Sequence, residues 1–326
     1  MKAAVLHRHG GEPRYQDHPD PVTATSRSLV RTSAAPIVPL DLLCAGGTSY
    51  FGPPALPYVP GVQGVGRVVE SAEFPSGTRV WFATSAGMAP GDGSMAEGCV
   101  VDDADLVVID STTSLDDAQV AAVGLSGVAA WMALTWRAGL RVGETVVVLG
   151  ATGAVGRSAL AAARHLGAGR VVAVCRGTSA ETDLLAAGAD AVVSTGDKEA
   201  DPADLGRRIA EAAGGPAQVV VDPVFGPVAT AAAAALGPGG RLVNIGGTAG
   251  DSAEFSSAVL RGRSIAILGY TNNALSPTQR ADALRSVLGV MGAKPDLVRP
   301  ERFPAGECSL AWETARSSRG RVVLEF

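Results

Sequence analysis

The chain has 326 residues, of which 47% are hydrophobic and 18% charged, and its formal net charge is −5. This composition predicts a soluble globular protein of two domains and excludes a disordered or fibrous chain. The negative charge argues against a nucleic acid or an anionic membrane as partner. We find no apolar span long enough to cross a bilayer and no signal peptide. The cysteines Cys44, Cys99, Cys175 and Cys308 are scattered without metal-binding spacing, which favours the reducing cytoplasm.

The first third of the chain is expected to be mainly β-structure with many turns. Short apolar or alternating runs predict strands over Met1–Leu6, Ser28–Ser33, Arg67–Glu70, Thr78–Ala83, Gly98–Val101 and Leu106–Ile109. A short helix is expected over Pro39–Cys44, because proline is favoured in a first helical turn. The Gly- and Pro-rich segment Ala45–Tyr58 is expected to be a long loop, and such loops in compact domains are usually functional.

From Ser114 onward, helical and strand patterns alternate. Ser114 and Asp117 have the spacing of a capping box, ahead of a helix over Ala118–Ala133. Further helices are expected over Ala154–Leu166, Ser179–Ala187, Ala203–Ala213, Val228–Leu236 and Thr278–Met291, and strands over Val146–Leu149, Arg170–Val174, Ala191–Ser194, Gln218–Asp222, Arg241–Ile245, Ser264–Thr271 and Arg321–Phe326. This alternation predicts a doubly wound parallel α/β sheet. We expect residues 118–274 to form this domain, and residues 1–117 and 275–326 to form the other.

The clearest chemical pattern lies in the strand–turn–helix–strand unit Thr145–Val174. Its turn fits the dinucleotide fingerprint G-x-G-x-x-G at Ala151, Gly153 and Gly156. Gly153 lets the backbone approach a pyrophosphate, Gly156 lets helix and strand pack closely, and the first helical N–H groups face the anion. The alternative is a glycine turn that binds nothing, but the strand–turn–helix context favours a nucleotide. The expected binding turn comprises Ala151, Thr152, Gly153, Ala154, Val155 and Gly156.

Taken together, these patterns resemble the medium-chain dehydrogenase/reductase superfamily and, within it, the zinc-free quinone oxidoreductases. The resemblance covers nearly the whole chain and rests on IVPLD (37–41) before a loop ending at Tyr50, LPYVPGVQGVGRVV (56–69), GATGAVG (150–156), VVVDPVFG (219–226), GGRLVNIGG (239–247) and GRVVLEF (320–326). It implies a β-rich, GroES-like catalytic domain completed by the C-terminus, with the cofactor in the cleft between the domains. It also implies a homodimer paired through the last strand of the nucleotide sheet, about Ile265–Thr271.

The resemblance bears directly on metal binding. Zinc-dependent relatives have a cysteine where this chain has Val38, and a His-Glu pair where it has Val62-Gln63. Valine cannot ligate zinc, and Trp81–Cys99 lacks the four cysteines of a structural zinc lobe. We therefore expect no metal. Without a Lewis acid, hydride from a nicotinamide is best delivered to a carbon activated by conjugation, as in quinones, enones, enals or enoyl groups. Such a reaction needs orientation in a dry cleft and donors to the developing enolate oxygen.

The choice between NADH and NADPH depends on the residues at the end of the second strand of the strand–turn–helix–strand unit. NAD enzymes place an acidic residue there, and in this chain the position falls at Cys175, followed by Arg176. A thiol removes the carboxylate that would repel a 2′-phosphate, and a guanidinium can bind that group. Thr178 and Ser179 can add hydroxyl donors. NADPH is therefore the expected cofactor; the alternative is that Arg176 is only a solvated loop cation.

The sequence identifies the residues near the substrate less specifically than those near the cofactor. Tyr50 matches a tyrosine that the family places in the cleft, where it can bind the substrate oxygen or relay a proton; alternatively it only anchors the loop. Val38 replaces an asparagine common in the family, which makes the pocket less polar. Asn273 is a candidate donor, as are Asn244 and Asn272, although each can instead cap a turn. Further expected cofactor contacts are Ser126, Gly246 and Asn272.

We therefore expect an NADPH-dependent reductase of a small molecule carrying an activated double bond or a quinone. A second interpretation is a pathway-specific ketone or enoyl reductase for a bulky substrate, which the Ala45–Tyr58 loop and the apolar Val38 and Val62 would suit. A third is an NADPH-binding protein without catalysis.

Overall fold

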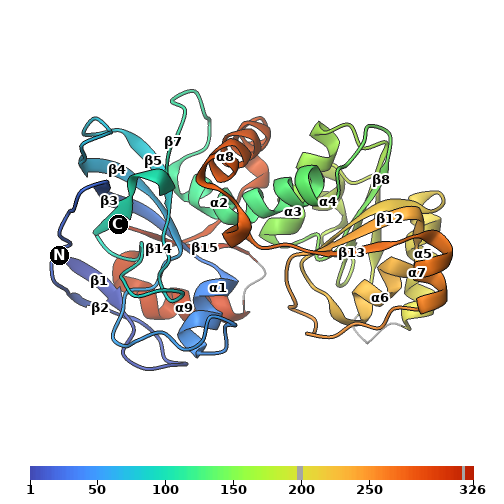
Figure 1. Cartoon of the computed structure of the whole chain (residues 1–326), viewed down its shortest axis with the longest axis horizontal. Helices are drawn as coiled ribbons and strands as arrows, with labels where there is room; N and C mark the ends of the chain where they lie inside the picture. Colours follow the sequence, from blue (N-terminus) through green and yellow to red (C-terminus); the bar gives the residue numbers. More distant parts are fainter. Residues whose placement is uncertain (197–200, 318–319) are drawn as a thin grey trace. The chain divides into compact units, whose positions relative to one another are not determined.

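The computed structural model describes residues 1–196, 201–317 and 320–326, and the chain divides into two compact units (Figure 1). Unit 1 comprises Met1–Gly124 and Gly292–Phe326, and unit 2 comprises Leu125–Met291. The chain thus passes between the units inside helix α2 (Asp117–Met132) and at the end of helix α8 (Pro277–Gly292), whereas the sequence suggested boundaries at 117/118 and 274/275. Gly124 interrupts α2 with a non-helical backbone at the first of these passages.

Unit 1 is built on a sheet in the order β14-β15-β3-β4-β5-β7, with β6 also pairing with β3. The C-terminal strand β15 (Val322–Glu325) runs antiparallel to the end of β3 (Arg27–Ile37), which places Val322 opposite Ile37. The tail of the chain therefore extends the sheet that begins in the chain with β3, whereas β1 and β2 pair with each other in a separate two-stranded sheet. The other elements are β1 (Lys2–Val5), β2 (Arg14–Asp17), β4 (Gln63–Glu70), β5 (Arg79–Ala83), β6 (Gly98–Asp102), β7 (Leu106–Val108), β14 (Glu301–Pro304), α1 (Pro39–Gly46) and α9 (Cys308–Ser317).

Helix α9, which the sequence patterns did not predict, closes one core of unit 1. Trp312 is 1% exposed and packs in a cluster with residues of β1, β3 and β15. Only three residues of α9 are buried, Cys308, Ala311 and Trp312. Such a short apolar stripe is too weak to stand out as a helical pattern.

Unit 2 is a six-stranded parallel sheet in the order β10-β9-β8-β11-β12-β13, as the alternating patterns predicted. Successive strands spread first to one side of β8 and then, from β11 on, to the other. In such sheets ligands bind beyond the carboxyl ends of the strands at this point of reversal. The strands are β8 (Thr145–Val148), β9 (Arg170–Cys175), β10 (Ala191–Ser194), β11 (Ala217–Asp222), β12 (Leu236–Asn244) and β13 (Ala266–Gly269); the helices before α8 are α3 (Ala154–His165), α4 (Glu181–Ala186), α5 (Pro202–Ala213), α6 (Gly226–Ala234) and α7 (Ser257–Arg263).

The core of unit 2 combines β-branched strands with small-residue helices. One face of the sheet packs against α5 and α6 through fully buried side chains such as Val147, Val172 and Val220. Helix α3 contributes nothing to that cluster and packs against β8 and β9 from the other face (Figure 1). Buried valines on both faces of a parallel sheet explain why these strands read as continuous apolar runs.

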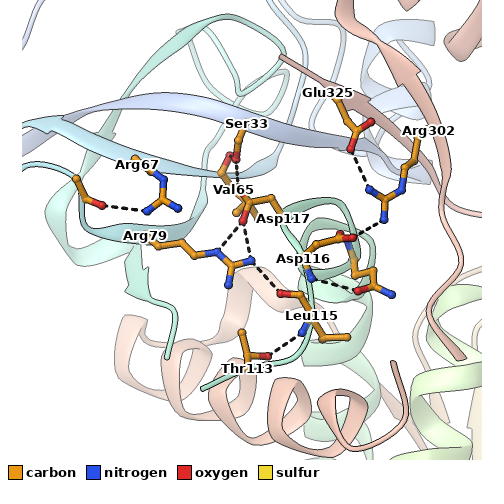
Figure 2. A network of polar contacts seen from close by, with 12 residues as sticks. Ser33, Val65, Arg67, Arg79, Thr113, Leu115, Asp116, Asp117, Arg302 and Glu325 are labelled. Carbon is orange, nitrogen blue, oxygen red and sulfur yellow. Dashed lines mark hydrogen bonds and ion pairs between the residues drawn. The ribbon is translucent and has the colours of Figure 1, made fainter. Parts of the chain in front are cut away.

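The start of α2 corrects one sequence prediction. Its capping box is formed by Asp116 and Gln119, whose side chains accept each other's backbone N–H groups at 2.9 and 3.1 Å. Ser114 instead donates to the Gly292 carbonyl, and Asp117 is bound by Ser33 and Arg79 (Figure 2). The cap therefore lies two residues further along, because the carboxylate of Asp117 is occupied elsewhere.

Helix α2 also corrects the expectation that no stretch is apolar enough to span a bilayer. Together with its π-helical continuation it covers Asp117–Arg137, which meets that test by length and composition. In its most apolar 18-residue window, 72% is buried within the structure, as in the core helix of a soluble protein. Its many alanines and glycines hide this apolar length from a search for large hydrophobic residues.

Arg241 ties the amino-terminal edge of the unit 2 sheet together. Its guanidinium forms a bidentate pair with Glu144, at 2.9 and 2.8 Å, and both side chains are more than four-fifths buried. It also donates to the carbonyls of Ala138, Gly139 and Gln218. The hydrogen bonds from Arg241 lower the pKa of Glu144, although burial opposes them.

We expect Glu144→Gln to lower the free energy of unfolding at pH 7 by about 1.5–3 kcal/mol, the usual contribution of hydrogen bonds to charged groups. A carboxylate with a lowered pKa stabilises the fold above its unfolded value, so the difference should shrink as the pH falls below 4.5. Urea denaturation at several pH values measures both effects. Asp282→Asn, in an exposed pair with Arg285, serves as the control and should change little. Equal losses from the two variants would contradict the prediction.

Candidate functional site

The fingerprint turn between β8 and α3 is held by two close backbone approaches. Gly150 has a positive φ of 57°, which favours glycine. A Cβ at Gly156 would overlap the Gly150 carbonyl oxygen and lie 2.6 Å from the Cα of Ala151. The N–H of Ala151 donates to the Val174 carbonyl at 3.0 Å, which joins the turn to β9. The geometry therefore brings the start of α3 against the carboxyl ends of β8 and β9.

The start of α3 presents free hydrogen-bond donors. Its N-cap is Gly153, and no side chain in the described part of the chain caps it. The first N–H groups of a helix lack partners within the helix, so those of Ala154 and Val155 are available to an anion. Arg157 donates to the Thr152 carbonyl at 3.2 Å and thereby fixes the turn. Arg157 was not singled out from the sequence, and Gly150 was noted only as part of GATGAVG, without a conformational role.

The loop after β9 carries the residues expected to select the cofactor. Cys175 ends the strand and is 3% exposed, with its thiol 3.5 Å from the Gly177 carbonyl oxygen. Arg176, Thr178 and Ser179 follow it and are all exposed. One cation and two hydroxyls therefore stand at the sheet edge to which the fingerprint turn belongs.

Beyond β11 and β12, polar side chains hold the loops of the same edge. Asp222 is fully buried and accepts the N–H groups of Val224 and Phe225, at 3.0 and 2.7 Å. Burial raises the pKa of Asp222, and its Oδ2 has no hydrogen-bond partner among residues 1–196, 201–317 and 320–326. Asn244 donates to the Gly246 carbonyl at 2.8 Å, so both belong to the edge of the expected site. Asp222 was not singled out from the sequence, although it ends the apolar run VVVD.

The structure brings Asn272 next to the segment of α2 that carries Ser126. Asn272 donates to the Leu125 carbonyl at 3.1 Å and accepts the Tyr270 hydroxyl at 2.6 Å. Both ends of its amide are therefore engaged in holding the structure. Ser126 is 8% exposed, whereas Asn273 is exposed on the adjoining turn.

The remaining candidates belong to unit 1. Val38 is 6% exposed and precedes α1, and Val62 is 1% exposed. Tyr50 is 78% exposed and lies against Phe51, with ring centroids 4.3 Å apart. Within the described ranges, no three His, Cys, Asp or Glu side chains are grouped to hold a metal ion.

Comparison with known proteins gives consistent matches. A family model described as zinc-binding dehydrogenase matches residues 154–288. Quinone oxidoreductase-like protein 2 of Mus musculus is 31% identical over 70% of this chain and 63% of its own length; quinone oxidoreductase of Homo sapiens is 32% identical over 51% and 50%. The solved quinone oxidoreductase of Thermus thermophilus, also described in complex with NADPH, is 29% identical, covers 100% of both chains and has a TM-score of 0.79.

A parallel dinucleotide-type sheet and a β-rich unit completed by the C-terminus, together with these matches, define the class: the chain belongs to the medium-chain dehydrogenase/reductase superfamily. Within that superfamily it is quinone oxidoreductase-like. The matched segments span about half to two-thirds of the curated relatives' own lengths.

The two glycines of the turn offer a matched pair of variants. Gly156→Ala forces the new Cβ into backbone, so we expect it to lower both stability and nucleotide affinity. Gly153 has φ −75°, and its nearest contact would be the Gly150 carbonyl at 3.4 Å, so Gly153→Ala should fold normally. If a pyrophosphate approaches Gly153 closely, that variant should still weaken NADPH binding by about tenfold or more, the effect of roughly 1.4 kcal/mol. Thermal unfolding and fluorescence titration separate the two effects; unchanged binding in Gly153→Ala would contradict this approach.

Proposed function

We propose that this protein is an NADPH-dependent, zinc-independent reductase that transfers hydride to a quinone or to a carbon–carbon double bond conjugated to a carbonyl. The observation that carries the proposal is the uncapped start of α3, held by Gly156 at the point of reversal of the sheet, with Arg176 exposed at the end of the neighbouring strand. The names of the curated relatives and the NADPH complex of the Thermus thermophilus protein support it.

The residues of unit 2 fit a dinucleotide. The N–H groups of Ala154, Val155 and Gly156 would hold the pyrophosphate, because a helix N-terminus attracts anions. Arg176 would bind the 2′-phosphate as a fork, with Thr178 and Ser179 adding hydroxyl donors. Ser126, Gly246 and Asn272 would lie toward the nicotinamide. When bound, NADPH supplies the hydride.

The residues of unit 1 would orient the acceptor. Val38 and Val62 are buried and apolar, and we assign them to the wall of the substrate pocket, where they exclude water. The Tyr50 hydroxyl would donate to the substrate oxygen as negative charge develops there, and Asn273 is a second candidate donor. Neither valine has a lone pair for zinc. The zinc-binding dehydrogenase model matches residues 154–288, which do not include these positions.

The experiment that tests the proposal follows NADPH oxidation by absorbance with a panel of quinones, enones and simple ketones, before and after chelation of metals. Turnover of quinones or enones that survives chelation supports it. Turnover of bulky ketones alone would favour the second interpretation from the sequence. NADPH binding without any turnover would favour a non-catalytic binding protein, and turnover abolished by chelation would overturn zinc independence.

Arg176→Ala should weaken NADPH binding by roughly ten- to a hundred-fold, since a charge-assisted contact contributes about 1.5–3 kcal/mol. NADH affinity should stay nearly unchanged, because NADH lacks the phosphate. Cys175→Asp should shift the preference toward NADH, and both effects should shrink in high salt because Arg176 is exposed. Titration of the wild type and both variants with each cofactor measures these changes. Equal weakening of both cofactors in Arg176→Ala would show that the residue only supports its loop.

We further propose a homodimer paired through β13, the edge strand beyond β12 in the unit 2 sheet. Its residues Ala266, Ile267 and Leu268 are only half-buried, and an apolar edge strand is a template for pairing. Light scattering at micromolar concentration should give the mass of two chains. Leu268→Lys should shift the mass toward one chain, whereas Leu185→Lys, on the exposed side of α4, should not. A monomeric wild type would refute the dimer.

A further inference from the structure

Asp41 is a buried carboxylate that joins two separate segments of unit 1. It lies in the first turn of α1 and is 2% exposed. Its Oδ2 accepts the N–H of Val38 at 2.9 Å, and its Oδ1 accepts the N–H groups of Gly61 and Val62 at 3.2 and 3.0 Å. One side chain therefore fixes the backbone at both valines assigned above to the pocket wall.

Arg321 binds the peptide group between Ile37 and Val38 at its carbonyl oxygen. Its Nη1 donates to the Ile37 carbonyl at 2.9 Å. The Ile37 carbonyl and the Val38 N–H belong to one peptide group, so Arg321 binds its oxygen and Asp41 binds its N–H. Arg321 directly precedes β15, whose first residue Val322 pairs with Ile37. The orientation of Val38 is thus determined by a residue near the C-terminus as well as by its own helix.

We propose that Asp41 and Arg321 are positioning residues, which hold Val38 and Val62 in place for a flat apolar acceptor and release them when Asp41 is protonated. This inference rests on the proposed function only for the assignment of the two valines to the substrate pocket. Neither residue is assigned a contact with substrate or cofactor.

Protonation of Asp41 falls in an accessible pH range. Burial raises the pKa of Asp41 from 3.8 to about 6, against the opposing effects of its three backbone hydrogen bonds and of Arg321. Protonation removes the negative charge and makes one carboxyl oxygen a hydroxyl, so the hydrogen bonds from the three N–H groups lose their charge assistance and weaken. Besides Arg321, the charge of Asp41 affects the pKa values of Cys44 and Tyr58. Burial raises both of these pKa values, so Cys44 and Tyr58 stay neutral through this range.

The direction in which Asp41 changes stability with pH distinguishes a positioning role from unfolding. Because the pKa of Asp41 is higher in the folded state than the usual 3.8, the folded chain binds more protons between about pH 4 and 6. This group therefore adds stability as the pH falls through that window. A loss of substrate affinity over the same window cannot come from unfolding caused by Asp41.

The test measures quinone reduction by the full-length protein with saturating NADPH between pH 5 and 8. If only the ionised form holds the pocket, KM for the quinone should rise about tenfold from pH 7.5 to pH 5, one unit below the midpoint. Because the 2′-phosphate of NADPH itself takes up a proton near pH 6, NADPH is kept saturating at every pH and the profile is read from KM for the quinone alone. Asp41→Asn should show the raised KM at every pH and a flat profile. Arg321→Met should move the midpoint to higher pH because a cation that favours the carboxylate is lost, whereas Arg321→Lys should retain the wild-type midpoint.

Asp117→Asn is the matched control. Asp117 is also an acid of unit 1 in the first turn of a helix, bound by Ser33 and Arg79 at 2.5 and 2.6 Å (Figure 2). It makes none of the three bonds of Asp41, so the wild-type KM profile should persist. A wild-type profile in Asp41→Asn, or the same change in Asp117→Asn, would overturn the inference.

Amide hydrogen exchange gives a readout that needs no turnover. The N–H groups of Val38, Gly61 and Val62 should exchange faster in Asp41→Asn than in Asp117→Asn at the same pH, and in the wild type their protection should fall below pH 6. If they stay protected in Asp41→Asn, the carboxylate does not hold them and the inference fails. If protection is lost but KM is unchanged, the positioning role fails. Absence of quinone or enone turnover in the wild type, with the expected exchange pattern, would instead refute the proposed function.

Discussion

The edge of unit 2 that we propose to bind a nucleotide depends on the absence of a side chain at Gly156. Because nothing separates this residue from the Gly150 carbonyl and the Cα of Ala151, helix α3 begins directly against β8. The short turn aims the free N–H groups of the helix past the end of the sheet, where the strand order reverses. The polar groups in the loops after β9, β11 and β12 lie at the same edge of the sheet as this turn. The valine-rich strands make the sheet rigid, and the glycine turn determines where the start of α3 lies.

Buried carboxylates in this protein serve mainly to hold backbone. Asp222 binds two N–H groups of the turn after β11, and Asp41 binds three N–H groups from two segments. In each case a charged or chargeable group is removed from water and compensated by peptide donors, which is the condition under which such burial is tolerated. The cationic and hydroxyl groups expected to meet a ligand, by contrast, stand exposed on loops. Residues that shape the sites and residues that would contact ligands are therefore largely different sets.

Local patterns predicted the β8–α3–β9 unit, the parallel sheet and the order of most elements, because valine runs, glycine turns and alanine helices each leave a sequence signal. They failed where the determining contact is distant. Helix α9 has too few buried residues to show a period, and the cap of α2 moved because Asp117 is engaged by Ser33 and Arg79. Asp41 and Arg321 both hydrogen-bond the Ile37–Val38 peptide group, but they lie about 280 positions apart in the sequence. Motif spacing therefore could not reveal this contact. Tyr50 was chosen by resemblance and Arg176 by chemistry, and the structure places both on exposed loops.

The location of the Arg241–Glu144 pair has a consequence for how this scaffold can change during evolution. The pair gathers five hydrogen bonds at the amino-terminal edge of the sheet, whereas the loop of Arg176, Thr178 and Ser179 extends from the opposite edge with exposed side chains. Surface substitutions away from such bonded networks usually alter stability little. If this loop selects the cofactor, as proposed above, single replacements in it can change cofactor preference while the fold tolerates each intermediate sequence. In such a scaffold the residues that stabilise the fold and the residues that would set specificity can change independently.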